Sequence, residues 1–135
     1  MSNATPENSY VADTMAVVLH LEGRRTSPHI KSIFDGTLRA ETAIYVPAIV
    51  FAEILYLSER QRITASLADL QRLLHTNPLI EEFPLSFAVV SAAAEITDIP
   101  ELHDRLIAGA ARLMKIPLLT NDPQIQASGF IQTIW

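Results

Sequence analysis

The chain has 135 residues and no cysteine, which excludes a disulfide framework and a thiolate metal site. Apolar residues make up 49% of it and charged residues 19%, proportions that predict one folded domain with a core and exclude a disordered chain. The net charge of -5 argues against a general nucleic-acid binder, which is usually basic, and is compatible with a cation-binding site.

The start of the sequence shows no targeting segment. No basic start leads into an apolar stretch, as in a signal peptide, and the longest apolar runs are too short to span a membrane. Together with the lack of cysteine, this predicts a cytoplasmic protein. Residues 1–8 are expected to be a disordered N-terminus or a cloning remnant, and residues 9–135 to form a single domain.

Short apolar runs alternate with helical patterns along the chain. In order, the sequence predicts a strand at 10–12, helices over 14–22 and 27–39, a strand at 44–46, a helix opened by Pro47, an amphipathic helix over 62–76, a weak strand at 79–83, helices over 86–96 and 101–114, and strands at 118–120 and 130–135. This alternation predicts an α/β fold in which a parallel sheet is covered on both faces.

Three aspartates stand at positions where such a fold gathers functional groups. Asp13 directly follows the first strand, and Asp122 follows the strand at 118–120 after one residue, Asn121. Asp104 lies in the first turn of a later helix that is apolar on most sides. Because parallel sheets place functional residues at the carboxyl ends of their strands, we expect these acids at one edge of the sheet.

A fourth acid, Glu53, is the one charged side chain in the apolar stretch of residues 45–57. In a helix, its neighbours three and four positions away would include no basic residue. A carboxylate among apolar neighbours is costly to bury unless something pairs with it, so its partner must come from elsewhere in the fold. A distant arginine or lysine is one possible partner, and a cation shared with the three aspartates is another.

Each aspartate also has a purely structural explanation. Asp13 and Asp122 could cap the helices or turns that follow them, and Asp104 could be a first-turn acid favoured by the helix dipole. His103 beside Asp104 suggests a histidine–aspartate metal pair, but no other histidine has an evident relation to it, so we discount that site. The pair Arg24-Arg25 is expected in a solvated loop and could also bind a phosphate group.

Four carboxylates at one edge of a sheet repel each other, so either some are protonated or a cation neutralises them. Ligand sets made only of oxygen select hard cations, Mg²⁺ or Mn²⁺. Such a cation can polarise a phosphate and activate water, which predicts hydrolysis of a phosphodiester. The sequence has no glycine-rich phosphate loop and no nucleophile elbow, which argues against an NTPase, a dinucleotide enzyme and a serine hydrolase.

The segments YVADTMAVV, VPAIVFAEILYL and HDRLIAGAARLMKIPLLTND, in this order, resemble the PIN-domain ribonucleases, especially the VapC-type toxins of toxin–antitoxin systems. The resemblance covers nearly the whole chain. The positions that match the family pattern are Asp13-Thr14, Glu53, Asp104 with Ile107-Ala108, and Thr120-Asn121-Asp122. One departure is Pro123-Gln124-Ile125, which stands where the family often has an aromatic residue.

The resemblance implies a three-layer α/β/α sandwich around a parallel five-stranded sheet, and Mg²⁺- or Mn²⁺-dependent endoribonuclease activity. It implies that the metal-site and catalytic acids are Asp13, Glu53, Asp104 and Asp122, with Thr14, Thr120 and Asn121 in supporting roles. It further implies an RNA substrate, a homodimer and a cognate antitoxin that blocks the acidic site.

Two other interpretations of the sequence stay open. One is a PIN-like module that retains the acids but binds RNA or protein without cutting. The other is a structural or partner-binding domain in which Glu53 pairs with an arginine. For any protein partner, we expect exposed apolar surface on the helices over 27–39 and 62–76.

Overall fold

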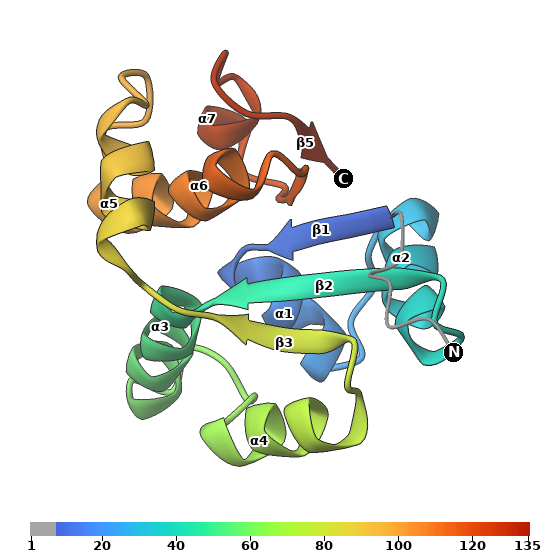
Figure 1. Cartoon of the computed structure of the whole chain (residues 1–135). Coiled ribbons are helices and arrows are strands. Elements are labelled where there is room, and N and C mark those ends of the chain that lie inside the picture. Colours follow the sequence, from blue (N-terminus) through green and yellow to red (C-terminus); the bar gives the residue numbers. More distant parts are fainter. Residues whose placement is uncertain (1–7) are drawn as a thin grey trace.

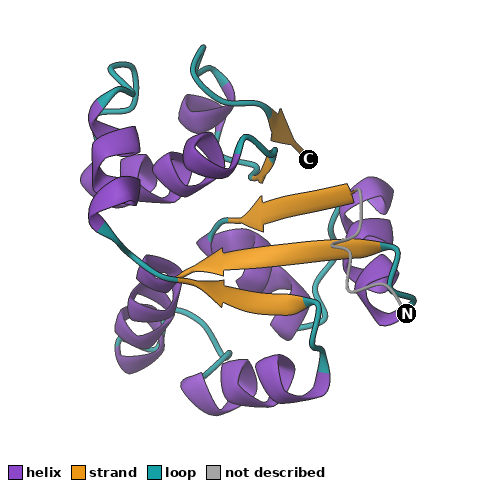
Figure 2. Ribbon diagram, viewed as in Figure 1, coloured by secondary structure: helices purple, strands orange, loops and turns teal. Residues whose placement is uncertain are grey.

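The structure is a computed structural model that describes residues 8–135. A five-stranded parallel sheet with the order β3-β2-β1-β4-β5 lies at its centre (Figures 1 and 2). The strands are β1 (Asn8–Ala12), β2 (Thr42–Pro47), β3 (Ile80–Phe83), β4 (Leu118–Leu119) and β5 (Thr133–Ile134). This confirms the predicted α/β class with a parallel five-stranded sheet. Apart from Asn8, which begins β1, the segment expected at 1–8 lies outside the described residues.

Helices connect the strands and cover the sheet (Figure 1). They are α1 (Thr14–Leu21), α2 (Pro28–Leu38), α3 (Ala48–Glu59), α4 (Leu67–Thr76), α5 (Phe87–Ala94), α6 (Leu102–Met114) and α7 (Pro123–Gln126). The helix α2 packs on β2, α4 packs on β3, and α6 packs on both β1 and α5. No helix in the described part of the chain has the length and apolar character that a membrane crossing needs.

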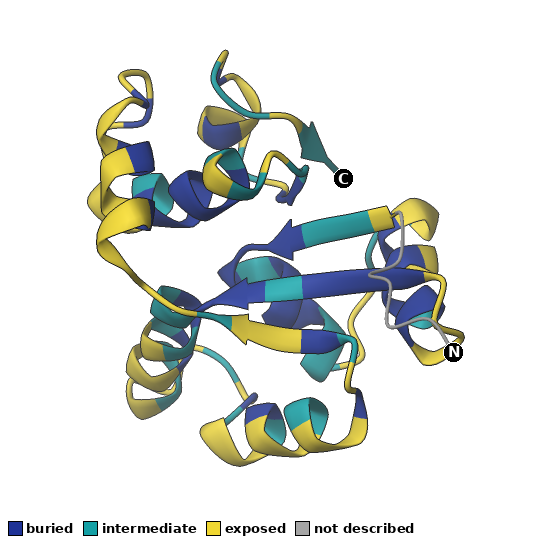
Figure 3. Cartoon of the chain, viewed as in Figure 1, coloured by how far each residue is buried: buried dark blue, intermediate teal, exposed yellow. Residues whose placement is uncertain are grey.

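The strands β1, β2 and β4 carry the core. Figure 3 shows their inner parts as buried, and aliphatic side chains such as Val11, Ile44 and Leu118 have no exposed surface. These strands are near-continuous apolar runs because a parallel sheet is covered on both faces. The parallel register pairs Val11 with both Tyr45 and Leu118, which brings the carboxyl ends of the three strands to one edge.

Local capping signals set where the helices begin. Ser27 accepts the Ile30 N–H at 3.2 Å and caps α2, whose first residue is Pro28, as expected. The helix α4 begins at Leu67, later than predicted, because Ser66 and Asp69 form a capping box that fixes its start. The short helix α7 was not expected, since four residues are too few to show a helical period.

The helices α5 and α6 approach each other very closely. A Cβ atom added at Gly109 of α6 would lie 2.9 Å from the Ala93 Cβ and 2.9 Å from the Val89 carbonyl oxygen of α5. Contacts this short leave no room for any other residue at that position. The small residue therefore fixes α6, and the acids at its start, against α5.

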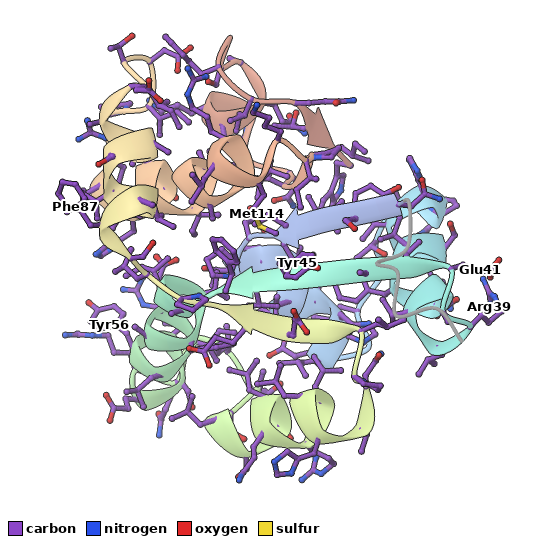
Figure 4. The ribbon with its side chains drawn as sticks, viewed as in Figure 1. Arg39, Glu41, Tyr45, Tyr56, Phe87 and Met114 are labelled. Atoms are coloured by element: carbon purple, nitrogen blue, oxygen red, sulfur yellow. The ribbon has the colours of Figure 1, made fainter. Side chains whose placement is uncertain are left out.

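Each of the two helices expected to expose apolar surface carries one large exposed apolar side chain, Leu38 on α2 (74%) and Leu67 on α4 (44%). The other large apolar side chains of α2, Ile30, Ile33 and Phe34, are buried, so this helix is also tied to the sheet. The large exposed apolar side chains include a cluster at α5, which we call the α5 apolar patch: Leu85, Phe87 and Val90, exposed by 47%, 84% and 44%. Figure 4 shows Phe87 and, on α3, Tyr56 pointing outward on the same side of the view.

Candidate active site

Asp13 lies where β1 passes into α1, and it caps that helix. Its backbone is extended (φ -80, ψ 177), and its carboxylate accepts the Ala16 N–H at 2.9 Å. The side chain is only 5% exposed. Burial raises the pKa of Asp13 to about 6, with further rises from the charges of Asp122 and Glu53, while hydrogen bonds from Thr120 and Ala16 oppose the rise.

The end of the neighbouring strand β4 places Thr120 and Asp122 beside Asp13. The Asp13 N–H donates to the Leu119 carbonyl at 3.1 Å, so the two chain segments leave the sheet together. Thr120 is fully buried, and its hydroxyl accepts the Asp122 N–H at 3.1 Å. Asp122 caps α7 by accepting the Gln124 N–H at 2.8 Å. The capping interpretation is thus correct for both aspartates and does not compete with a place in the site.

Glu53 projects from the middle of α3 toward the same place. Its Oε1 accepts the Thr14 hydroxyl, and its Oε2 lies 3.7 Å from the His103 Nδ1. Within residues 8–135, no arginine or lysine forms an ion pair with Glu53. The structure therefore offers no support for the alternative in which a structural arginine explains this carboxylate.

Asp104, in the first turn of α6, completes the set of acids. It is half-buried, and burial is the main cause that raises its pKa to about 6. The negative charges of Glu101, Asp122, Glu53 and Asp13 raise that pKa further, in this order. The carboxyl groups of three separate elements thus act on Asp104, as expected of acids gathered at one edge of the sheet.

The four acids face a single open cleft of about 430 Å³. Besides them, the cleft is lined by Thr14, Met15, Leu57, Ile107, Asn121 and Pro123. The sequence therefore predicted which acids share this cleft. It also predicted the two polar neighbours that line it, Thr14 and Asn121.

A family model of the PIN domain matches residues 10–130. The chain belongs to the PIN-domain family. This confirms the PIN-domain resemblance of the quoted segments. A comparison with curated proteins found no match.

Solved structures similar to this PIN domain include two VapBC proteins. One is VapBC2 from Rickettsia felis, bound to a DNA fragment of its promoter. It has a TM-score of 0.70 and 17% sequence identity, and the match covers 94% of this chain and 98% of that chain. DNA-bound VapBC from Salmonella typhimurium has a TM-score of 0.69 and 16% sequence identity, and the match covers 94% of this chain and 97% of that chain. The PIN domain endonuclease Utp24 has a TM-score of 0.51 and 17% sequence identity, and the match covers 93% of this chain and 78% of that chain. These likenesses show a common fold.

The acids of this PIN domain fit a hard divalent cation by ligand type. They are all oxygen ligands, and no arginine or lysine in the described part of the chain forms an ion pair with Asp13 or Asp104. No group of three acidic or histidine side chains in the described range stands close enough to form a finished metal site. Mg²⁺ fits this arrangement because it keeps several waters and often uses one or two carboxylates.

Two residues at the start of α6, Glu101 and His103, lie next to the acids without lining the cleft, and His103 is the residue discounted from the sequence alone. Glu101 caps the helix by accepting the N–H groups of His103 and Asp104, each at 3.1 Å. The His103 Nδ1 lies 3.3 Å from the Glu101 Oε1 and stands between Glu101 and Glu53. No other histidine in the sequence has an evident relation to His103, because its neighbours are two glutamates that only the packing of α6 against α3 brings close.

Proposed function

We propose that this PIN domain is an Mg²⁺- or Mn²⁺-dependent endoribonuclease that hydrolyses RNA phosphodiester bonds, and that it is the toxin of a toxin–antitoxin pair. The observation that carries the proposal is a cleft lined by four acids in which two carboxyl groups have a pKa of about 6 and no arginine or lysine partner among the described residues. Membership of the PIN-domain family and the similarity to the endonuclease Utp24 support a nuclease. The proposal places the protein in the cytoplasm with its RNA.

In this proposal, Asp13, Glu53, Asp104 and Asp122 would hold the cation. A bound divalent cation supplies activation of water and stabilisation of the charge that develops on the phosphate. The Thr14 hydroxyl holds the Glu53 carboxylate in place, and Thr120 does the same for Asp13. Asn121 is exposed at the rim and presents an amide that can donate a hydrogen bond to the substrate.

The competing interpretation is a PIN-like module that binds RNA or protein without cutting. Such a module has no use for a charge-repelling set of carboxylates, whose gathering costs stability unless a cation offsets it. The uncompensated acids therefore favour the enzyme.

We test the enzyme with Glu53→Gln. Glutamine keeps the shape and can still accept the Thr14 hydroxyl, so the fold should persist while the negative charge is lost. Cleavage of single-stranded RNA with Mn²⁺ should fall by about a hundredfold or more, the effect of removing a positioned catalytic group. The matched control is Glu59→Gln, an exposed acid near the end of the same helix, which should cut at the wild-type rate.

Normal cleavage by Glu53→Gln would show that the site assignment is wrong. Binding of RNA by the wild-type protein without any cleavage in Mn²⁺ would favour the binding module. Loss of the folded state in Glu53→Gln, seen by circular dichroism, would instead assign Glu53 to a structural role.

We also infer two protein partners. A small antitoxin would deliver a basic side chain to the cleft, because a guanidinium that reaches Asp13 or Asp104 satisfies the carboxylates without activating water. The similarity to VapBC proteins supports such a partner. A second copy of the chain would cover the α5 apolar patch, since exposed apolar surface of this kind usually marks an interaction site.

A further inference from the structure

A second hollow of about 390 Å³ lies beside the acidic cleft, between α3 and the start of α6. It is lined by Ile49, Ala52, Glu53, Tyr56, Leu57 and His103. Two of these residues, Glu53 and Leu57, also line the acidic cleft. The two hollows therefore share a wall. If the bond that reacts lies at the acids, the part of the ligand next to that bond lies at the second hollow.

The walls of the second hollow fit a flat ligand with polar edges. Tyr56 is 53% exposed and the His103 side chain is 52% exposed, so two planar rings face solvent beside aliphatic side chains. At its border with the cleft, the Glu53 Oε2 and the His103 Nδ1 offer polar atoms to the edge of a ligand. Proteins that bind single-stranded RNA combine aromatic stacking surfaces with polar contacts to base edges in this way.

A cation lies over one face of the half-exposed Tyr56 ring, so a base would stack on the other face. The Arg60 guanidinium carbon lies 4.4 Å from the centroid of the Tyr56 ring. Arg60 forms no ion pair with any carboxylate in the described part of the chain, so its charge is available to a ligand. In a chain with a net charge of -5, a free cation beside an aromatic ring matches the phosphate and the base of one nucleotide.

We propose that the hollow between α3 and α6 binds the base of a nucleotide next to the scissile phosphodiester of single-stranded RNA, with Tyr56 as its stacking surface and Arg60 as its backbone contact. This inference rests on the proposed function, because it places the reacting bond at the four acids. A side chain of a protein partner is the other class of occupant. The wall shared with the cleft and the available cation favour RNA.

The first experiment compares two probes, a single-stranded RNA hexanucleotide of mixed sequence and the same ribose–phosphate backbone without bases. Binding is measured by fluorescence anisotropy in Mn²⁺, in an Asp122→Asn background that prevents cleavage. Tyr56→Ala should weaken binding of the base-bearing RNA by about tenfold and leave the abasic backbone unaffected. Tyr56→Phe should bind as the parent does, because it keeps the ring.

Two further variants test the contact with the RNA backbone and control for unspecific effects of removing an exposed side chain. Arg60→Ala should weaken both probes and lower the dependence of binding on salt by about one released ion. Leu38→Ala is the matched control, since Leu38 is an exposed apolar residue (74%) on α2, remote in sequence from every residue of the two hollows. It should change neither affinity.

The outcomes distinguish this inference from the proposed function. Cleavage of RNA by the wild-type protein, together with equal base-dependent affinity in Tyr56→Ala, would overturn the base site alone. Tyr56-dependent RNA binding without cleavage by the wild-type chain would support the base site and contradict the nuclease. A Tyr56→Ala variant that loses self-association in light scattering but keeps full RNA affinity would show a protein contact and overturn the inference, as would a wild-type chain that binds neither probe.

Discussion

At the scale of single residues, Asp13 serves both the fold and the candidate site. Its carboxylate accepts the Ala16 N–H and so begins α1, and the same group lines the acidic cleft. Burial raises its pKa to about 6, well above the value of 3.8 expected in an unfolded chain. The folded protein therefore holds a proton at this position over a pH range in which the unfolded chain has lost it. The pKa of Asp104 is raised as well, to about 6, so this carboxyl also keeps its proton at a higher pH in the folded protein.

This predicts the sign of the pH dependence of stability. Between about pH 4 and 6 the folded state binds more protons than the unfolded state, so the free energy of unfolding of the metal-free protein should fall as the pH rises. Asp13→Asn should remove part of that fall, because asparagine keeps the helix cap but carries no charge. At neutral pH it should stabilise the protein by up to about 3 kcal/mol, which corresponds to a pKa raised from 3.8 to about 6. Urea unfolding in EDTA measures both effects.

The matched control for Asp13 is Asp98→Asn, whose effect has the opposite sign. Hydrogen bonds, first from the Gly129 N–H, lower the pKa of Asp98, so its charge stabilises the folded state at neutral pH and this contribution is lost only as the pH falls toward its lowered pKa. Asp98→Asn should therefore destabilise the protein. Added Mn²⁺ should raise the melting temperature of the wild type more than that of Asp13→Asn. A metal-free stability that rises between pH 4 and 6 would contradict this account.

At the scale of elements, the close contact of α5 with α6 has two consequences. Gly109 lets the helices approach, which sets the start of α6 and its acid Asp104 against the sheet edge. The outward side of α5 is left with the α5 apolar patch, whose member Phe87 is 84% exposed. Burial of such side chains is favourable, so the patch is the best candidate for self-association.

We therefore predict that the protein is a dimer in solution and that Phe87→Ser weakens the dimer. Loss of an exposed aromatic anchor at an interface should raise the dimer dissociation constant by about tenfold or more. Light scattering over a range of concentrations measures this constant. Leu38→Ser, which removes an apolar side chain exposed by 74% from α2, should leave this constant unchanged. A wild-type chain that is monomeric at every concentration would exclude the dimer.

The helices that could be predicted are those with a local signal in the sequence. Ser27 and Pro28 marked the start of α2 because a cap and a fixed φ act within the segment itself. The start of α4 was misplaced, although Ser66 and Asp69 carried the capping-box signal, because Ile63 also fits the helical spacing. A local pattern therefore predicts where a helix begins only when one start position alone fits the pattern.

The three aspartates could be predicted because each follows a strand or lies at the start of a helix, and Glu53 because it is the one charged residue in an apolar helical stretch. The place of His103 could not, because its distance to Glu53 depends on how α6 packs against α3. The α5 apolar patch and the second hollow also depend on packing between elements. No residue pattern within one segment reports such packing.

At the scale of the whole molecule, the strand order brings together acids from distant parts of the chain. The strand β1 lies between β2 and β4, so the first and last aspartates of the site leave the sheet side by side. With a net charge of -5 and a cleft of carboxylates, the chain has the charge that a basic segment of an inhibitor would complement.

We predict that the product of the neighbouring open reading frame is such an inhibitor. Co-expression should yield a complex with the chain and abolish RNA cleavage, because a basic side chain in the cleft displaces the cation. Alanine substitution of that arginine or lysine in the partner should restore cleavage while the complex still forms. Finding neither a complex nor a loss of cleavage would exclude this partner.

The pairing of β1 with β4 also bears on synthesis of the protein. The ribosome delivers Asp13 early and Asp122 only when most of the chain has been made, and β4 cannot join β1 before then. An unfinished polypeptide thus lacks a complete set of acids. Under the proposed nuclease function, nascent copies on a polysome would spare the transcript that is producing them, and prematurely terminated products would be inactive.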